Sequence, residues 1–117
     1  ICLGMQLLCN TSEEGNTQGL NIFSCDVRKF TNKLKVPQMG WNIIKNLKGP
    51  LYEKIENSYV YLVHSYYVPV INSTISVTNY GLEYSSAIQK DNFFGVQFHP
   101  EKSSKVGSSI LKNFLNL

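Results

Sequence analysis

The residues with the greatest chemical potential stand at the two ends of this 117-residue sequence. Cys2 is followed by Leu3 and Gly4, and a helix-like apolar run begins at once. A nucleophile elbow has this pattern, with the nucleophile where a strand turns sharply into a helix. The positive end of a helix dipole favours the thiolate, and the Leu3 N–H could face a developing oxyanion. The alternative for Cys2 is a buried structural cysteine.

The second group of reactive residues is His99-Pro100-Glu101, close to the C-terminus. In extended chain, residues two apart project from the same face, and Pro100 favours extended geometry at His99. Glu101 could then orient one imidazole nitrogen while the other faces a nucleophile, as in a catalytic triad. A structural histidine beside a surface glutamate is the alternative for this motif alone. Together with Cys2, the motif predicts a cysteine nucleophile with a histidine base.

The elements that must position these residues are those of an α/β protein. Residues 5–9 are predicted as a helix, and residues 37–42 as a loop or bulge. Residues 20–30 suggest two short strands, and residues 51–55 a short helix. A further helix is expected at 104–115, with Ser103 as its N-cap. Strands are expected at 59–63 and 93–98, and a hairpin that turns at Gly81 at 75–80 and 83–89.

Composition and charge exclude several classes of function. The net charge of +3 comes from scattered basic residues, so no nucleic-acid-binding face is predicted. No apolar run approaches the roughly 18 residues that cross a bilayer, and no membrane association is expected. Cys2, Cys9 and Cys25 form an odd set without CxxC spacing or nearby histidines, so neither a disulfide framework nor a metal site is predicted. A reducing, cytoplasmic setting fits this cysteine usage best.

Stretches spread over the whole chain resemble the class I (triad-type) glutamine amidotransferases. They are ICLGMQLL, SEEG, VPQMGWN, YLVHSYY and GVQFHPEKS. The QFHPE stretch is typical of the superfamily, whereas PQMGWN and VHSYYV are most similar to the glutaminase subunits of imidazole glycerol phosphate synthases, of histidine biosynthesis. The resemblance implies a flavodoxin-like, three-layer fold with a mixed sheet, of which this chain would be the C-terminal part.

The resemblance also implies roles for individual residues. Cys2 would attack the amide of glutamine, His99 would act as acid and base, and Glu101 would hold the histidine tautomer. No cofactor is expected, because a thiolate with an acid–base partner suffices for amide hydrolysis. The residues implied to bind glutamine are Leu3, Gln6, Glu14, Ser65 and Tyr66.

The expected partner is a (β/α)₈-barrel cyclase, with which the chain would form a heterodimer. The cyclase would take up the ammonia and release imidazole glycerol phosphate and AICAR. The residues implied to face it are Met39, Trp41, Tyr61 and Lys102. His64 is expected to make local hydrogen bonds rather than to act in catalysis.

One departure from the family concerns the start of the chain, which opens inside an element with no cap before it. The sequence is therefore expected to be a partial type 1 domain, 1–117, without roughly the first eighty residues of the family, and to be unstable or inactive alone. Two alternative functions stay open. One is a paralogous glutaminase that supplies ammonia to a sugar amidotransferase of surface polysaccharide synthesis. The other is a non-catalytic partner-binding module or an inactive fragment.

Overall fold

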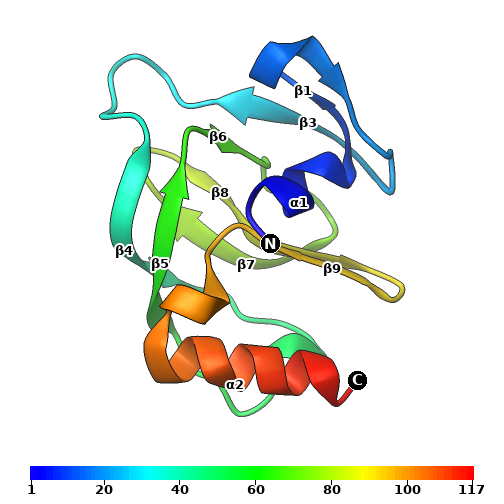
Figure 1. The fold of residues 1–117 in the computed structure, drawn as a ribbon, viewed down its shortest axis with the longest axis vertical. Helices are drawn as coiled ribbons and strands as arrows, with labels where there is room; N and C mark the ends of the chain where they lie inside the picture. Colours follow the sequence, from blue (N-terminus) through cyan, green and yellow to red (C-terminus); the bar gives the residue numbers. More distant parts are fainter.

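Strands from distant parts of the sequence build three small sheets, with one helix near each end of the chain (Figure 1). The structure is a computed structural model that describes residues 1–117. No helix in it combines the length and the apolar character that crossing a membrane requires. The helices are α1 (Leu3–Leu7) and α2 (Ser104–Leu115), and the 3₁₀ turns are η1 (Glu14–Asn16), η2 (Pro50–Tyr52) and η3 (Pro100–Lys102). The strands are β1 (Cys9–Ser12), β2 (Thr17–Gln18), β3 (Phe23–Lys29), β4 (Gln38–Ile44), β5 (Ser58–His64), β6 (Tyr66–Tyr67), β7 (Thr74–Asn79), β8 (Glu83–Lys90) and β9 (Phe93–Val96).

The strand pairing makes this a mixed α/β fold, which confirms the predicted fold class. The orders are β2-β1-β3-β6, β4-β5 and β7-β8-β9. Strands β1 and β3 run parallel, and the other paired strands run antiparallel. Isolated bridges from Lys45 to Val77 and from Val68 to Ser85 join neighbouring sheets. Figure 1 shows α2 running below the strands and α1 above β9.

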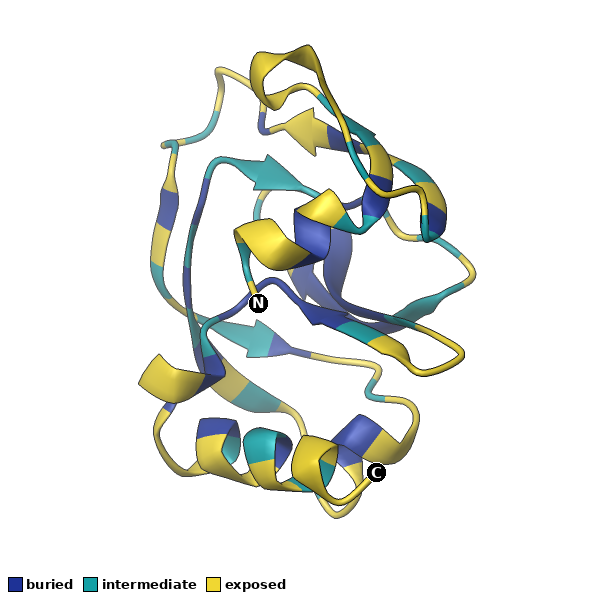
Figure 2. Cartoon of the chain, turned by 45° about the vertical axis from the view of Figure 1, so that its right-hand side comes forward, coloured by how far each residue is buried: buried dark blue, intermediate teal, exposed yellow.

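Two apolar clusters lie between these layers, and burial follows them (Figure 2). The larger cluster joins α2 to β4, β5, β7, β8 and β9, with Phe98 and Ile110 among its members. The smaller cluster lies between α1, β1 and β3, where Met5 and Phe23 are buried. Gly95 allows α1 to approach β9, because a Cβ at that position would come within 2.9 Å of the Met5 side chain. The start of α1 is thereby held against the strand that leads to His99.

Several elements are confirmed close to their predicted places. The expected strand at 59–63 lies within β5, and α2 covers the expected 104–115. The predicted hairpin is β7 paired with β8, and it turns at Gly81, whose φ is +72°. Glycine adopts this left-handed conformation without the steric penalty of a side chain.

Other elements differ from the prediction. Residues 37–42 are not a loop, because β4 pairs with β5 from Gln38, opposite His64, to Ile44, opposite Ser58. The polar residues of this stretch hid the strand: Gln38 is buried, and its amide is hydrogen-bonded inside the molecule. Residues 20–30 hold one strand, β3, where two were expected, and the predicted helix at 51–55 is the 3₁₀ turn η2. The strand expected at 93–98 ends at Val96.

Candidate active site

Cys2 occupies a sharp turn at the N-terminus of α1. Its backbone φ of 51° and ψ of −113° lie outside the regions that side-chain-bearing residues favour. Such strain is typical of functional turns, including the nucleophile elbow. The backbone N–H of Cys2 donates to the carbonyl of Val96 at 2.8 Å, at the end of β9. The predicted nucleophile is therefore bound to the strand that ends three residues before His99.

The groups around the Cys2 sulfur have opposite effects on the pKa of its thiol. The thiol donates weakly to the Val63 carbonyl at 3.8 Å, whereas the Gln97 amide nitrogen donates to the sulfur at 3.6 Å. Burial raises the pKa of the Cys2 thiol, and it outweighs the Leu3 N–H and the Gln97 amide, which lower the pKa. The N-terminus of α1 favours the thiolate as predicted, since the Leu3 N–H lowers the pKa, but burial has the larger effect and the pKa is raised. Helix α1 has only five residues, and desolvation dominates.

His99 and Glu101 form the base-and-carboxylate pair that the sequence predicts. The imidazole Nδ1 lies 2.6 Å from Oε1 of Glu101, so a proton on Nδ1 is shared with the carboxylate and Nε2 stays available. The geometry differs from the expected extended chain, because residues 100–102 form the 3₁₀ turn η3. The turn brings Glu101 back to its neighbour, and His99 itself keeps an extended backbone with φ −100° and ψ 96°.

A buried hydroxyl fixes the turn that carries this pair. His99 N–H donates to the Tyr61 carbonyl at 2.9 Å, and the Tyr61 N–H donates to Ser103 Oγ at 3.0 Å. Ser103 Oγ in turn donates to the His99 carbonyl at 2.6 Å. Ser103 occupies the predicted N-cap position of α2, but its side chain caps no helix N–H, because the hydroxyl is used between β5 and η3. His99 is therefore anchored to β5 on both sides of its backbone.

Figure 1 shows the start of the chain beside the segment that leads from β9 into η3, and the Cys2–Val96 backbone hydrogen bond joins them. Glu101 is close enough to Cys2 for its charge to raise the pKa of the thiol. The sulfur is not hydrogen-bonded to His99, since its partners are Val63 and Gln97. Catalytic hydrogen bonds often tighten only when substrate is bound.

A cavity of about 190 Å³ opens beside Cys2. Its lining includes all five residues that the sequence analysis implied for glutamine binding. It also includes Cys2 and two residues of β5, Val63 and His64, which the sequence analysis did not assign to binding. Its lining residues are Cys2, Leu3, Gln6, Glu14, Val63, His64, Ser65 and Tyr66. The loop after α1 and the end of β5 thus meet at the predicted nucleophile.

His64 lies at the inner end of this cavity and makes the local hydrogen bonds expected of it. Its Nδ1 lies 2.7 Å from the Tyr66 carbonyl, an acceptor only, so Nδ1 carries the proton. Its Nε2 then accepts from the Gln38 amide at 2.8 Å. Burial lowers the pKa of His64 to about 4, so the ring is neutral near pH 7.

The whole chain, residues 1–117, matches the family model described as "Glutamine amidotransferase class-I". The chain belongs to this family. The resemblance drawn from its motifs is thereby confirmed.

Three curated relatives of this glutamine amidotransferase chain carry the name "Imidazole glycerol phosphate synthase subunit HisH". The protein of Buchnera aphidicola subsp. Acyrthosiphon pisum is 55% identical over 122 residues, and that of Bacteroides fragilis is 52% identical over 121 residues. The protein of Methanocaldococcus jannaschii is 50% identical over 121 residues. Each alignment covers 100% of this chain and 62% of the relative. The chain thus spans about three fifths of the length of these relatives.

The four residues implied to face a partner lie on adjoining elements of the glutamine amidotransferase chain. Met39 and Trp41 of β4 are 66% and 53% exposed. The Trp41 ring meets the Tyr61 ring of β5 edge to face, with centroids 6.1 Å apart. Lys102 Nζ lies 5.9 Å from the centroid of the Tyr61 ring. These residues form one exposed aromatic and cationic surface, the Trp41 surface.

The sequence analysis missed the contribution of Gln97 to the site. Gln97 is fully buried, yet its amide reaches both Cys2 and Gln6. The glutamine was read only as part of the QFHPE stretch. A polar side chain inside an otherwise apolar strand pattern is the signal that could have drawn attention to it.

Proposed function

We propose that this chain carries the glutaminase chemistry of an imidazole glycerol phosphate synthase. The proposal is supported by the cavity at Cys2, whose lining includes all five residues implied to bind glutamine. It is also supported by the His99–Glu101 pair and by the name that the relatives share. The cavity is the observation that carries the proposal, because it gives a glutamine side chain a place beside the thiol.

The first chemical step breaks the carbon–nitrogen bond of the substrate amide. Cys2 loses its proton to His99 and its sulfur bonds the side-chain carbonyl carbon of glutamine, forming a tetrahedral oxyanion. Leu3 is the first residue of α1, so its backbone N–H has no acceptor within the helix. In this step the Leu3 N–H donates to the oxyanion. The intermediate collapses as His99 returns the proton to nitrogen. Ammonia leaves and a γ-glutamyl thioester remains.

The second step hydrolyses the thioester. His99 accepts a proton from water as the water oxygen bonds the same carbon, and the sulfur leaves as thiolate. The proton on His99 then restores the thiol, and glutamate is released. Glu101 holds the Nδ1 proton throughout, so that Nε2 is the nitrogen that exchanges protons.

The ammonia is proposed to pass to a (β/α)₈-barrel cyclase docked on the Trp41 surface, in a heterodimer that makes imidazole glycerol phosphate. The position of η3 supports this arrangement, because Lys102 of the Trp41 surface follows Glu101 directly. A partner at this surface would cover the side of the site where His99 is exposed. Ammonia could then transfer without entering bulk water.

The test is glutamine hydrolysis by the full-length subunit, with and without the cyclase subunit. We expect glutamate release that rises when the cyclase is added and disappears in Cys2→Ala. Cys25→Ala is the matched control, because it removes a thiol away from the cavity, and it should keep the wild-type rate. Undiminished turnover in Cys2→Ala would reject the proposed function.

A further inference from the structure

Three side-chain and backbone groups link the Cys2 sulfur to the interior of the fold. The Gln97 amide nitrogen lies 3.6 Å from the sulfur, and its oxygen accepts from Gln6 Nε2 at 2.9 Å. Gln6 Nε2 also donates to the carbonyl of Tyr66 at 3.0 Å. Gln6 is 6% exposed and Gln97 is fully buried, so water does not compete for these bonds.

The Tyr66 carbonyl determines how the amide groups of Gln6 and Gln97 are oriented. The Tyr66 carbonyl can only accept, so the atom of Gln6 that faces it must be the amide nitrogen. The second hydrogen of that nitrogen then points to Gln97, whose facing atom must be the amide oxygen. The nitrogen of Gln97 is left to face the sulfur. A backbone carbonyl thus determines that Cys2 meets a hydrogen-bond donor.

The Gln97 donor acts in the same direction as the Leu3 N–H, whereas the Val63 carbonyl has the opposite effect on the sulfur. The Val63 carbonyl at 3.8 Å accepts from a thiol and repels a thiolate. An amide N–H stabilises a thiolate more than a thiol, since hydrogen bonds to charged groups are the stronger ones. Burial also disfavours the thiolate. The Gln97 amide is the side-chain group that opposes both effects.

We propose that Gln97 is a positioning residue that stabilises the Cys2 thiolate through an amide whose direction is set by Gln6 and the Tyr66 carbonyl. The proposal rests on the proposed function, because it concerns the same nucleophile. It gives Gln6 a second role besides lining the cavity. With Nε2 committed to two acceptors, the amide oxygen of Gln6 is the atom that remains for a ligand.

The experiment measures how fast iodoacetamide alkylates Cys2 in the full chain as a function of pH, with label counted on the peptide that carries Cys2. Two variants are compared with wild type. Gln97→Met removes the amide but keeps an unbranched side chain. Gln97→Glu keeps an oxygen for Gln6 and presents an oxygen, not a donor, to the sulfur.

Both variants should shift the alkylation profile to higher pH, and Gln97→Glu should shift it further because of its charge. At a fixed pH below the midpoint, the rate should fall roughly tenfold, as expected for loss of a hydrogen bond to a charged group. Gln89→Met, the same change in a side chain away from the site, should leave the profile unchanged. A purely structural role of Gln97 would change the melting temperature but not the pH midpoint. Profiles that match wild type in both variants would overturn the proposal.

A measurement on the unaltered residue covers the case in which the variants do not fold. The NMR resonances of the Gln97 side-chain amide should move with the Cys2 titration in wild type and stay constant in Cys2→Ser. Resonances that ignore the titration would overturn the inference. Glutamine turnover of Cys2→Ala in parallel separates the two claims, because turnover without Cys2 rejects the proposed function itself. Loss of turnover with unaltered Gln97 profiles rejects only the role of Gln97.

Discussion

At the scale of single residues, the surroundings of the two histidines favour opposite roles. His99 has a 21% exposed side chain and a carboxylate on Nδ1, which favours acid–base exchange at Nε2. His64 is buried, with a backbone carbonyl on Nδ1 and the Gln38 amide on Nε2. Burial lowers its pKa to about 4, so it remains neutral and structural. The sequence indicated these roles through the Glu101 neighbour, which His64 lacks.

The depressed pKa of His64 makes stability depend on pH. The folded chain releases the proton at about pH 4 and the unfolded chain near the ordinary 6.5. Between these values the unfolded state binds more protons, so stability is complete above pH 6.5 and is lost as the pH falls towards 4. Between pH 7 and pH 5 we expect the free energy of unfolding to drop by about 2 kcal/mol from this residue. Urea unfolding of wild type and His64→Gln would measure it, since the variant should lack this drop.

The contradicting outcome for His64 is specific. If His64→Gln shows the same loss of unfolding free energy from pH 7 to pH 5 as wild type, another group causes the pH dependence. The variant keeps an acceptor towards Gln38, so a general loss of stability at both pH values would not imitate the predicted result.

At the scale of elements, the sequence predicted the apolar parts of the fold and missed the polar ones. The β-branched and aromatic residues at 59–63 indicated β5, and Gly81 between 75–80 and 83–89 indicated the hairpin of β7 and β8. Strand β4 was missed, since Gln38, Gly40 and Asn42 have low strand propensity. Cross-strand pairing with β5 and a buried hydrogen-bond network decide that segment. Contacts of this kind depend on residues far away in the sequence.

The same limit applies to the candidate site. The motifs predicted side chains that lie at the cavity, with Cys2, Leu3 and Gln6 among them, whereas His99 is not part of its lining. The 3₁₀ geometry of η3 and the use of the Ser103 hydroxyl were not predictable from spacing. Both follow from the approach of β5, which supplies the Tyr61 backbone groups.

The link between β5 and η3 predicts the effect of Ser103→Ala. The change leaves the buried Tyr61 N–H and the His99 carbonyl each without its hydroxyl partner, which should cost about 2 kcal/mol of unfolding free energy. Because the anchor of His99 is loosened, kcat for glutamine hydrolysis should fall roughly tenfold while KM changes little. Ser108→Ala is the control, an exposed position of α2 where both quantities should stay at wild-type values. A Ser103→Ala enzyme with wild-type kcat would show that η3 needs no such anchor.

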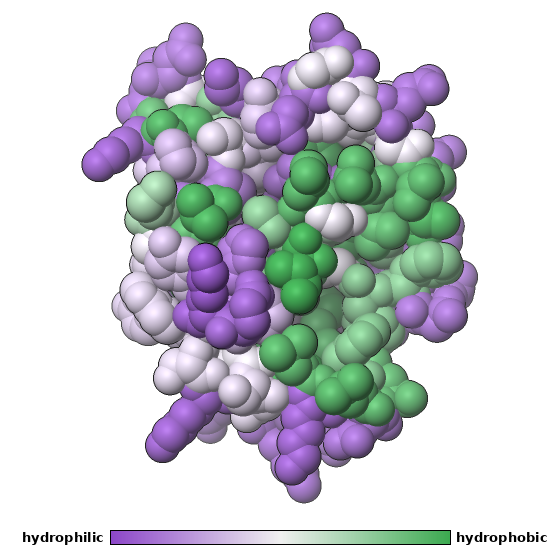
Figure 3. Space-filling view, in the orientation of Figure 1, coloured by the Kyte–Doolittle hydropathy of each residue, from purple (hydrophilic) through white to green (hydrophobic).

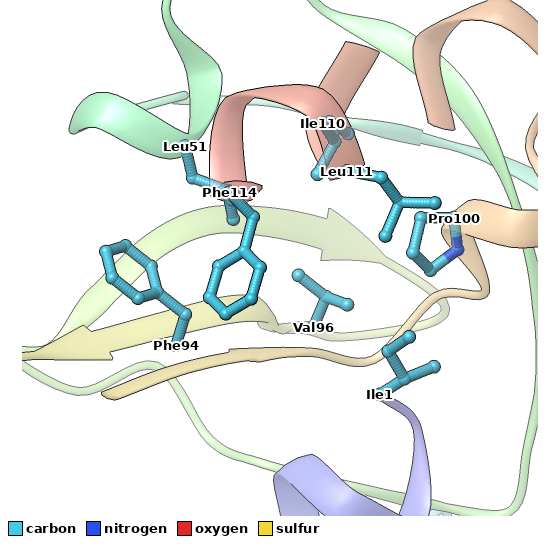
Figure 4. A pocket seen from close by; sticks show the side chains of 8 residues that line it. All are labelled: Ile1, Leu51, Phe94, Val96, Pro100, Ile110, Leu111 and Phe114. Atoms are coloured by element: carbon cyan, nitrogen blue, oxygen red, sulfur yellow. The ribbon is translucent and has the colours of Figure 1, made fainter. Parts of the chain in front are cut away.

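At the scale of the whole molecule, two surfaces stand out. One is the Trp41 surface on β4, β5 and η3. The other is an apolar face between α1, β9 and α2, visible as the connected green area in Figure 3. It includes a hollow of about 280 Å³, whose side chains converge from α2, β9 and the first residue (Figure 4). Its lining residues are Ile1, Leu51, Phe94, Val96, Pro100, Ile110, Leu111 and Phe114.

Monomeric proteins rarely leave an apolar patch of this kind uncovered. The expectation that roughly eighty further residues belong to the domain stays a prediction. The instability expected of residues 1–117 alone also stays a prediction. Ile1 and Leu3 are 53% and 52% exposed beside the predicted nucleophile.

The Trp41 surface gives a direct test of partner binding, because Trp41 is the sole tryptophan of the chain. Its exposed indole should lose contact with water when the cyclase subunit docks, so its fluorescence should shift to shorter wavelength. Trp41→Ala should weaken binding at least roughly tenfold, as for a buried aromatic anchor. Phe114→Ala, on the apolar face, should bind as wild type does. Unchanged emission at saturating cyclase would place the partner elsewhere.

The central claim is that the thiol at one end of the chain and the imidazole near the other end act as one catalytic unit. The most direct measurement is the rate at which a chloroketone analogue of glutamine labels each cysteine of the full chain with the cyclase present. The account predicts label on Cys2, with a rate that falls roughly hundredfold in His99→Asn. Label on Cys9 or Cys25 in place of Cys2, or a rate that His99→Asn leaves unchanged, would contradict it.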